Sequence, residues 1–329
     1  MNKLIDDKFL LANKYFHKNQ IDLAVKECQD ILNDEPDYIQ ALNLMALIGL
    51  KSENYDLADS YFKKCLNIDN KNILVIKNYC VSLKKQQKLK DANKFLLRLY
   101  ELTNASPDVT FELANNLLLT NNKEYALDIV KNALKNNTDS DLLNATMGNV
   151  LHELKQFEES EKYYKKAYLT NKDNFQILFR LGYYSLNNKK YHQSIDYFER
   201  IVKNIEKFQN FSQLHHLVYY NIGLSYENLS EFDQAEKYYL TAYELNQNDT
   251  NTLVNLSSVY NEKGEFSKAI ELINKAISLN PENRTLYSNL GKIYYKMGDH
   301  RKYLYYNRLG NGVVILETDA ESGLFKISD

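Results

Sequence analysis

The stretch "YYNIGLSYENLSEFDQAEKYY" (residues 219–239) places a glycine, Gly223, in the middle of a segment whose apolar spacing predicts a helix. Glycine in a helix interior costs about 1 kcal/mol relative to alanine, so this position is expected to require a residue without bulk. The segment "LVNLSSVYNEKGEFSKAIELINKAISLNP" (253–281) aligns with the first one at an offset of 34 residues and places Ser257 on Gly223. The chain therefore carries an internal repeat.

Extending this frame divides the chain into nine repeats, which start at Ile5, Ile39, Ile73, Pro107, Asp141, Phe175, His216, Thr250 and Arg284. The eighth place of each repeat holds a small residue: Ala12, Ala46, Cys80, Ala114, Gly148, Gly182, Gly223, Ser257 and Gly291. The twentieth place holds Ala24, Ala58, Ala92, Ala126, Ser160, Ser194, Ala235 and Ala269. We therefore predict helix, turn, helix in each repeat, with small residues where two helix backbones approach closely. The alanines indicate that a Cβ is tolerated in the eighth place.

This pattern resembles the tetratricopeptide repeat family, whose unit spans 34 residues. Residues 250–283 match best, with Leu253, Leu256, Tyr260, Gly264, Ala269, Ala276 and Pro281 in the family's places. The resemblance covers residues 5–309. It implies an all-α fold, a right-handed α-solenoid of helix-turn-helix repeats, in which the first helix of each repeat lines a concave groove.

The expected domain organisation is an array of about nine repeats followed by a tail. The repeats are 5–38, 39–72, 73–106, 107–140, 141–174, a lengthened 175–215, 216–249, 250–283 and a degenerate, capping 284–309. The seven extra residues of 175–215 equal about two helical turns, so the helices around "QNFS" (209–212) are expected to lengthen. The insertion is either neutral or a hinge or contact site. In the last repeat, Tyr303 stands where the other repeats have a small residue, so the sequence does not decide whether the second helix of this repeat forms.

The tail, residues 310–329, does not continue the helical repeat pattern. Two strand-like segments, "GVVILET" and "GLFKIS", flank "DAES" and favour a short β-hairpin. Three roles stay open for this strand-like tail: it folds over the end of the array, pairs with a partner strand, or begins a domain that is absent from this chain.

Residue types that carry chemistry are sparse and scattered. The 6 histidines and 3 cysteines show no metal-ligand spacing, and no glycine-rich phosphate-binding motif occurs. The cysteines are interpreted as small buried hydrophobes. With 41 Lys and Arg against 43 Asp and Glu, no nucleic-acid partner is indicated. No signal peptide or membrane span is evident. We predict a cytoplasmic protein without catalytic residues, cofactor, metal or membrane contact, and thus no enzyme.

The resemblance places the fifth, sixth and ninth residues of each repeat in the groove. Asparagine recurs in the sixth place, where its amide can bind a peptide bond, and this resembles the asparagine ladder in the repeat array of O-linked N-acetylglucosamine transferases. The candidate groove residues are Asn78, Asn115, Asn149, Phe179, Arg180, Tyr183, Tyr220, Asn221, Asn255 and Asn289. Two alternatives remain: the asparagines reflect repeat consensus, and the aromatic residues pack against adjoining repeats.

The sequence therefore favours a non-catalytic protein–protein interaction scaffold that binds an extended peptide or protein partner in the groove. The alternative is a substrate-recognition arm or subunit of an enzyme system, of glycosyltransferase, sulfotransferase or oxygenase type, whose catalytic domain is absent from this chain. Formation of a homo-oligomer through the terminal repeats or the tail is a third hypothesis.

Overall fold

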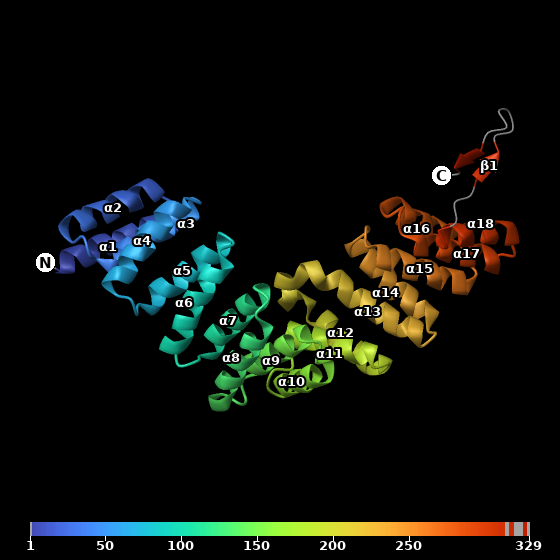
Figure 1. The fold of residues 1–329 in the computed structure, drawn as a ribbon, viewed down its shortest axis with the longest axis horizontal. Coiled ribbons are helices and arrows are strands. Elements are labelled where there is room, and N and C mark those ends of the chain that lie inside the picture. Colours follow the sequence, from blue (N-terminus) through green and yellow to red (C-terminus); the bar gives the residue numbers. More distant parts are fainter. Residues whose placement is uncertain (1, 313–315, 319–324, 328–329) are drawn as a thin grey trace. The chain divides into compact units, whose positions relative to one another are not determined.

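The computed structural model describes residues 2–312, 316–318 and 325–327 (Figure 1). Within these residues the chain is almost entirely α-helical, and it forms two compact units, an N-terminal unit (Met1–Thr170) and a C-terminal unit (Asn171–Asp329). In both units each odd-numbered helix up to α17 packs against the helix that follows it, and we call these the first and second helices of a repeat. The predicted helical-repeat fold class is confirmed.

The N-terminal unit contains five helix pairs. Their helices are α1 (Asn2–His17), α2 (Ile21–Asp34), α3 (Ile39–Lys51), α4 (Tyr55–Ile68), α5 (Ile73–Lys85), α6 (Leu89–Leu102), α7 (Pro107–Leu119), α8 (Lys123–Asn136), α9 (Asp141–Glu153) and α10 (Phe157–Thr170). First helices of successive repeats also contact each other directly, as α1 does with α3 and α7 does with α9. One face of this unit is therefore built from first helices.

The C-terminal unit contains four more pairs. Their helices are α11 (Phe175–Asn187), α12 (Tyr191–Lys203), α13 (His215–Asn228), α14 (Phe232–Leu245), α15 (Thr250–Lys263), α16 (Phe266–Leu279), α17 (Arg284–Lys296) and α18 (His300–Gly310). The second helix of the last repeat, which the sequence left open, is thus formed. Strands β1 (Leu316–Thr318) and β2 (Phe325–Ile327) pair antiparallel, as a hairpin requires. The "DAES" turn expected between them lies outside the described residues.

The small residues of the eighth place make room for an aromatic ring. An added Cβ would lie 2.7 Å from a ring of the paired second helix at three glycines: Gly148 meets Tyr164, Gly182 meets Phe198 and Gly223 meets Tyr239. Real Cβ atoms do not approach so closely, so the prediction that a Cβ is tolerated in this place is wrong for these repeats. At Gly291 the nearest atom would be 3.4 Å away, which is an ordinary contact.

Serine side chains show how near the paired backbones are. Ser160 Oγ donates to the carbonyl oxygen of Gly148 at 2.6 Å, and Ser257 Oγ donates to that of Ala269 at 2.8 Å. A hydroxyl on one Cβ can reach the backbone of the other helix only where the two helices lie close together. The predicted close approach of the paired helices is therefore confirmed in these repeats.

In the turn between the two helices, the residue in the fifteenth place of the repeat adopts the left-handed backbone conformation. Positive φ values occur there at Asn19, Glu53, Gln87, Asn121, Lys155, Lys189, Ser230, Gly264 and Gly298. A left-handed conformation costs a residue with a Cβ about 1–2 kcal/mol, whereas glycine adopts it freely. Seven of the nine repeats thus carry this strain.

Replacing Lys189 with glycine is therefore expected to stabilise the C-terminal unit by about 0.5–1 kcal/mol, after the larger entropy of an unfolded glycine is subtracted. Lys189 is exposed and has φ 59°, so the change removes strain and little else. The reverse change, Gly264→Ala at φ 78° with open space around it, should destabilise by about 1 kcal/mol. Urea unfolding followed by circular dichroism measures both, and a destabilising Lys189→Gly would contradict the prediction.

The extra residues of 175–215 do not lengthen the helices, so that prediction is wrong. They form a separate 3₁₀ segment, η1 (Ile205–Leu214), in which Phe208 and Phe211 leave helical geometry. Both rings pack on Phe175, Phe211 parallel to it at 4.4 Å and Phe208 edge-on at 5.6 Å. His215 Nε2 lies 3.1 Å from the Phe208 carbonyl oxygen. Aromatic packing on Phe175 thus holds the inserted segment.

Candidate functional site

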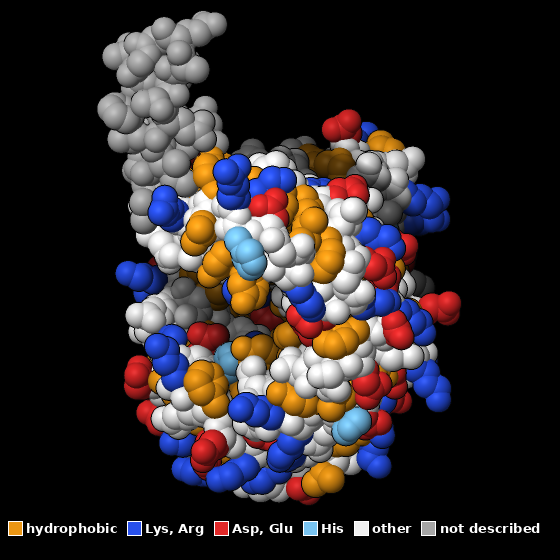
Figure 2. All heavy atoms as spheres, turned by 90° about the vertical axis from the view of Figure 1, so that its right-hand side faces the viewer, with side chains coloured by type: hydrophobic (Ala, Val, Ile, Leu, Met, Phe, Trp, Pro, Cys, Tyr) orange, Lys and Arg blue, Asp and Glu red, His pale blue; other side chains and the backbone are white. Residues whose placement is uncertain are grey.

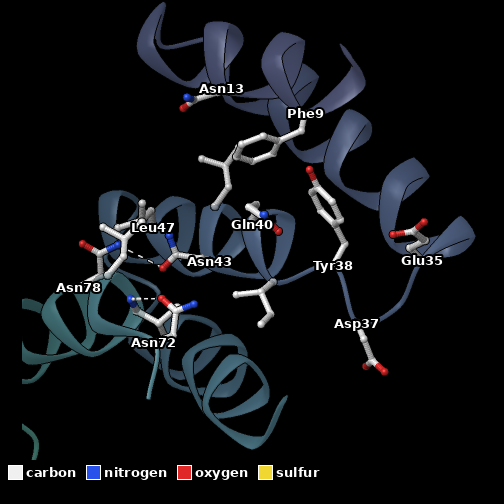
Figure 3. Close-up of a pocket in the computed structure, with 14 residues that line it drawn as sticks. Phe9, Asn13, Glu35, Asp37, Tyr38, Gln40, Asn43, Leu47, Asn72 and Asn78 are labelled. Carbon is white, nitrogen blue, oxygen red and sulfur yellow. Dashed lines mark hydrogen bonds between the residues drawn. The ribbon is translucent and has the colours of Figure 1, made fainter. Parts of the chain in front are cut away.

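The first-helix face of the N-terminal unit contains a cavity of about 730 Å³ (Figure 3). Residues of α1, α3, α5 and the connection between α2 and α3 line it. We call it the Asn43 cavity, after the asparagine on its central helix. Its size lies within the range of about 300–1,000 Å³ that is typical of ligand pockets.

Two asparagines from neighbouring repeats are joined in this cavity. Asn78 Nδ2 donates to Asn43 Oδ1 at 3.1 Å (Figure 3). Asn43 is only 8 % exposed, because α3 is buried along most of its length. Among the described residues, Asn43 Nδ2 has no acceptor and Asn78 Oδ1 has no donor. Asn43 thus keeps a free donor and Asn78 a free acceptor, groups that can complement the C=O and N–H groups of an extended peptide.

Apolar and aromatic side chains lie beside the amide pair. The Phe9 and Tyr38 rings meet edge-to-face at 5.9 Å, and Leu44 and Leu47 add aliphatic surface. Tyr38 Oη donates to Asp6 Oδ1 at 2.9 Å. Burial and this carboxylate raise the pKa of Tyr38 to about 12, so its hydroxyl stays a neutral donor at physiological pH.

Two smaller cavities follow on successive first helices of the same unit. One of about 250 Å³ lies among α5, α6 and α7, and Cys80 and Val81 contribute to it. The other, of about 400 Å³, is lined by α7 and α9 and brings the predicted residues Asn115 and Asn149 together. The structure thus brings Asn115 and Asn149 into one cavity and places Asn78 in another, all on one face of one unit.

The predicted residues of α13, α15 and α17 do not all lie together. Asn255 and Asn289 share a cavity of about 240 Å³ between α15 and α17. Asn255 Nδ2 donates to the hydroxyl of Tyr220 at 3.1 Å, so this tyrosine serves as an internal partner. Asn221 does not join them: it is 7 % exposed, and its Nδ2 donates to the Leu217 carbonyl of its own helix at 2.7 Å.

The remaining predicted residues lie on α11. Phe179 packs on Phe175 and Phe198 at 5.8 and 5.5 Å, and both of these rings lie in its own repeat rather than in an adjoining one. Tyr183 is 38 % exposed and Arg180 is half-buried. Tyr183 therefore remains available as a contact residue, whereas Phe179 belongs to the aromatic packing around the insertion.

Comparison with known families agrees with this repeat geometry. Sequence models described as "Tetratricopeptide repeat" or "TPR repeat" match residues 39–72, 143–174, 175–207, 216–249 and 257–298, together more than half of the chain. The chain belongs to the tetratricopeptide repeat (TPR) family. Among curated proteins, none matches the sequence significantly.

Solved structures share this TPR fold at low sequence identity. A chain of the APC/C hetero-tetramer Cut9–Hcn1 aligns with a TM-score of 0.57 and 15 % identity over 86 % of this chain and 54 % of its own length. PilF of Pseudomonas aeruginosa gives 0.51 and 17 %, over 61 % of this chain and 88 % of its own. PilW, a widely conserved type IV pilus biogenesis factor, gives 0.52 and 15 %, over 61 % and 90 %. These identities show the fold alone, and the chain spans about half of the first of these structures.

Several lining residues of the Asn43 cavity were missed in the sequence. Phe9 and Asn43 occupy the fifth place of their TPR repeats, and Asn13 and Leu47 occupy the ninth. These are the places that identified candidates in the middle repeats, so the same frame applied to the first two repeats would have found them. The prediction for the cysteines is confirmed: all three are buried, and burial raises the pKa of the Cys80 thiol to about 12.

Other classes of site are not evident in the described part of this TPR protein. No group of three or more His, Cys, Asp or Glu residues is arranged to hold a metal ion within it. None of its helices combines the length and apolar character that crossing a bilayer requires. On the face shown in Figure 2, basic and acidic side chains are interspersed, in keeping with the net charge of -2.

A half-buried carboxyl group, that of Glu227, is linked to Asn255 through a tyrosine hydroxyl. Glu227 Oε2 accepts a hydrogen bond from Tyr239 Oη at 2.7 Å, and that hydroxyl also accepts from Asn255 Nδ2 at 3.2 Å. Burial raises the pKa of Glu227 above its ordinary value of 4.5, although its hydrogen bonds lower it in part. The folded protein therefore favours the protonated carboxyl of Glu227 more strongly than the unfolded chain does.

Glu227→Gln is accordingly expected to stabilise the protein near neutral pH and to have less effect near pH 4.5. The contribution of Glu227 to stability is fully present below its unfolded pKa and is lost as pH rises through the higher folded pKa. Glutamine keeps an acceptor for Tyr239 without the charge. Urea midpoints of both proteins across this pH range test the prediction, and a difference that does not change with pH would contradict it.

Proposed function

We propose that this TPR protein is a non-catalytic scaffold that binds an extended peptide, or an extended segment of a partner protein, on the first-helix face of its N-terminal unit. The observation that carries the proposal is the Asn43–Asn78 pair, which leaves one donor and one acceptor free in a cavity of about 730 Å³. Such a pair can bind a main chain whatever its sequence, and no cofactor is needed.

The spacing of the cavities supports an elongated ligand. The three cavities described above for the N-terminal unit involve α1, α3 and α5, then α5, α6 and α7, then α7 and α9. Neighbouring packed helices lie about 8–10 Å apart, and an extended chain advances about 3.3 Å per residue. A bound peptide would therefore advance by about three residues per repeat and offer one side chain to each cavity.

The experiment is a selection of binders followed by affinity measurement. Phage-displayed random dodecapeptides are selected on the full chain, and the selected peptide is labelled for fluorescence anisotropy. Asn78→Leu should weaken its binding at least about tenfold, or 1.4 kcal/mol, because it removes the amide pair and fills the cavity. Gln40→Trp, a change at an exposed residue that lines the cavity, should weaken it similarly without a packing defect.

The matched control is Asn132→Ala, which removes an exposed amide from the second helix α8 of the same unit. It should leave affinity unchanged, and thermal melting by circular dichroism reports whether each variant is folded. Unchanged affinity of both Asn78→Leu and Gln40→Trp would overturn the proposal, as would a selection that yields no binding peptide.

A further inference from the structure

The Asn43 cavity has an acidic side that the amide pair does not explain. Glu35 and Asp37, in the connection between α2 and α3, both line it, and none of its fourteen lining residues is Lys, Arg or His. Asp6 adds a third carboxylate next to the cavity, hydrogen-bonded to Tyr38 Oη. A ligand that enters the cavity therefore meets negative charge without a nearby positive lining residue.

These carboxylates are not neutralised internally. Within the described residues, Glu35 and Asp37 form no ion pair. The nearby Lys8 is engaged with a different residue, Asp34, at 3.2 Å. Carboxylates that remain unpaired beside a cavity complement a cationic group on a ligand, and such complementarity contributes specificity and association rate.

Aromatic rings lie next to this charge. Phe9 and Tyr38 are half-buried and contact each other edge-to-face. Figure 3 shows Glu35 on the side of Tyr38, and Asn43 and Asn78 on the opposite side of the cavity. A main chain held by the amides could thus extend a long side chain across the rings, which suit both an aliphatic stem and a cationic head.

From this arrangement we infer that the Asn43 cavity selects peptides that carry a lysine or arginine side chain. The inference rests on the proposed peptide-binding function and adds the chemical class of the ligand. The amide pair binds the main chain, the Phe9 and Tyr38 rings contact the methylene groups, and Glu35 and Asp37 attract the cationic head.

A charge-resolved selection tests this inference. The full chain is immobilised and offered decapeptides with acetylated and amidated ends, in which one position is fixed in turn as Lys, Arg, Gln, Leu or Glu. Lys and Arg peptides should be enriched at least about threefold over Gln peptides at about 50 mM salt, and less at about 500 mM, because salt screens the attraction. Glu peptides should be depleted.

Two double variants with equal net charge locate the effect. Glu35→Gln with Asp37→Asn should abolish the preference for Lys and Arg. The control variant, Asp173→Asn with Glu282→Gln, also removes two carboxylates, both of them exposed. Both residues hold the same turn position in their repeats as Asp37 does, but they lie outside every cavity described above. This variant should therefore keep the preference for Lys and Arg. Equal preference in the two variants, or enrichment of Gln, Leu or Glu peptides, would overturn the inference. If the protein retains peptides without a charge preference, only this inference is overturned. If it retains no peptide at all, the proposed function is overturned as well.

Discussion

Replacing Gly223 with leucine is expected to lower the free energy of unfolding of the C-terminal unit by about 3 kcal/mol, the upper end of common overpacking effects. Even a Cβ would lie 2.7 Å from Tyr239 Cδ1 and 2.9 Å from Cε1. The Tyr239 ring is fully buried, and Glu227 and Asn255 hold its hydroxyl, so it cannot move aside cheaply. Urea unfolding, with hydrogen exchange to locate the loss, measures the effect.

Alanine substitutions in the same place of two repeats supply the matched control. Gly223→Ala should destabilise by about 1–2 kcal/mol, because the clash with Tyr239 exceeds the gain in helix propensity. Gly291→Ala meets no atom closer than 3.4 Å and should gain up to about 1 kcal/mol. Effects of the same sign in both variants would show that the ring does not set the requirement for glycine.

Phe175→Ala is expected to cost about 3–5 kcal/mol, the range for truncating a buried phenylalanine. Phe175 is 2 % exposed and packs against Phe208, Phe211 and Phe179. Its loss should also release η1, so hydrogen exchange of residues 205–214 should rise more than that of α13. Chemical denaturation and hydrogen-exchange mass spectrometry measure the two effects.

The control for this variant is Phe157→Ala, since Phe157 is 49 % exposed at the start of α10. Its truncation should cost much less than that of Phe175. A loss below about 1 kcal/mol for Phe175→Ala, with η1 still protected, would mean that the aromatic packing does not hold the insertion.

The repeat frame could be predicted because residue size follows a regular pattern in the sequence. Small residues recur at fixed places, and Ser160 shows directly that the backbones meet there. The reason for glycine rather than alanine was missed, although the aromatic residue sixteen positions after Gly223 was in the sequence. The insertion was predicted wrongly because helical periodicity does not show that an inserted segment will leave helical geometry, as it does where the Phe208 and Phe211 rings pack on Phe175.

Sequence reasoning found only some of the residues that line the Asn43 cavity. The sixth place gave Asn78, which lies in this cavity, and Asn221, whose amide bonds to its own helix, an option open to any helical asparagine. The buried partner Asn43 was missed because the fifth place was considered only in the middle repeats, and its pairing with Asn78 joins two repeats, so no single repeat shows it. A single-sequence pattern assigns places within a repeat, whereas such pairs depend on how repeats stack.

The most direct test of the central claim is to locate a bound peptide by photo-crosslinking. Benzoylphenylalanine is placed at Leu74, which is exposed and lines the Asn43 cavity, or at Lys131, which is exposed on the second helix α8. The account predicts crosslinks of the selected peptide to position 74 and none to position 131. Crosslinks at position 131 without any at position 74 would contradict it.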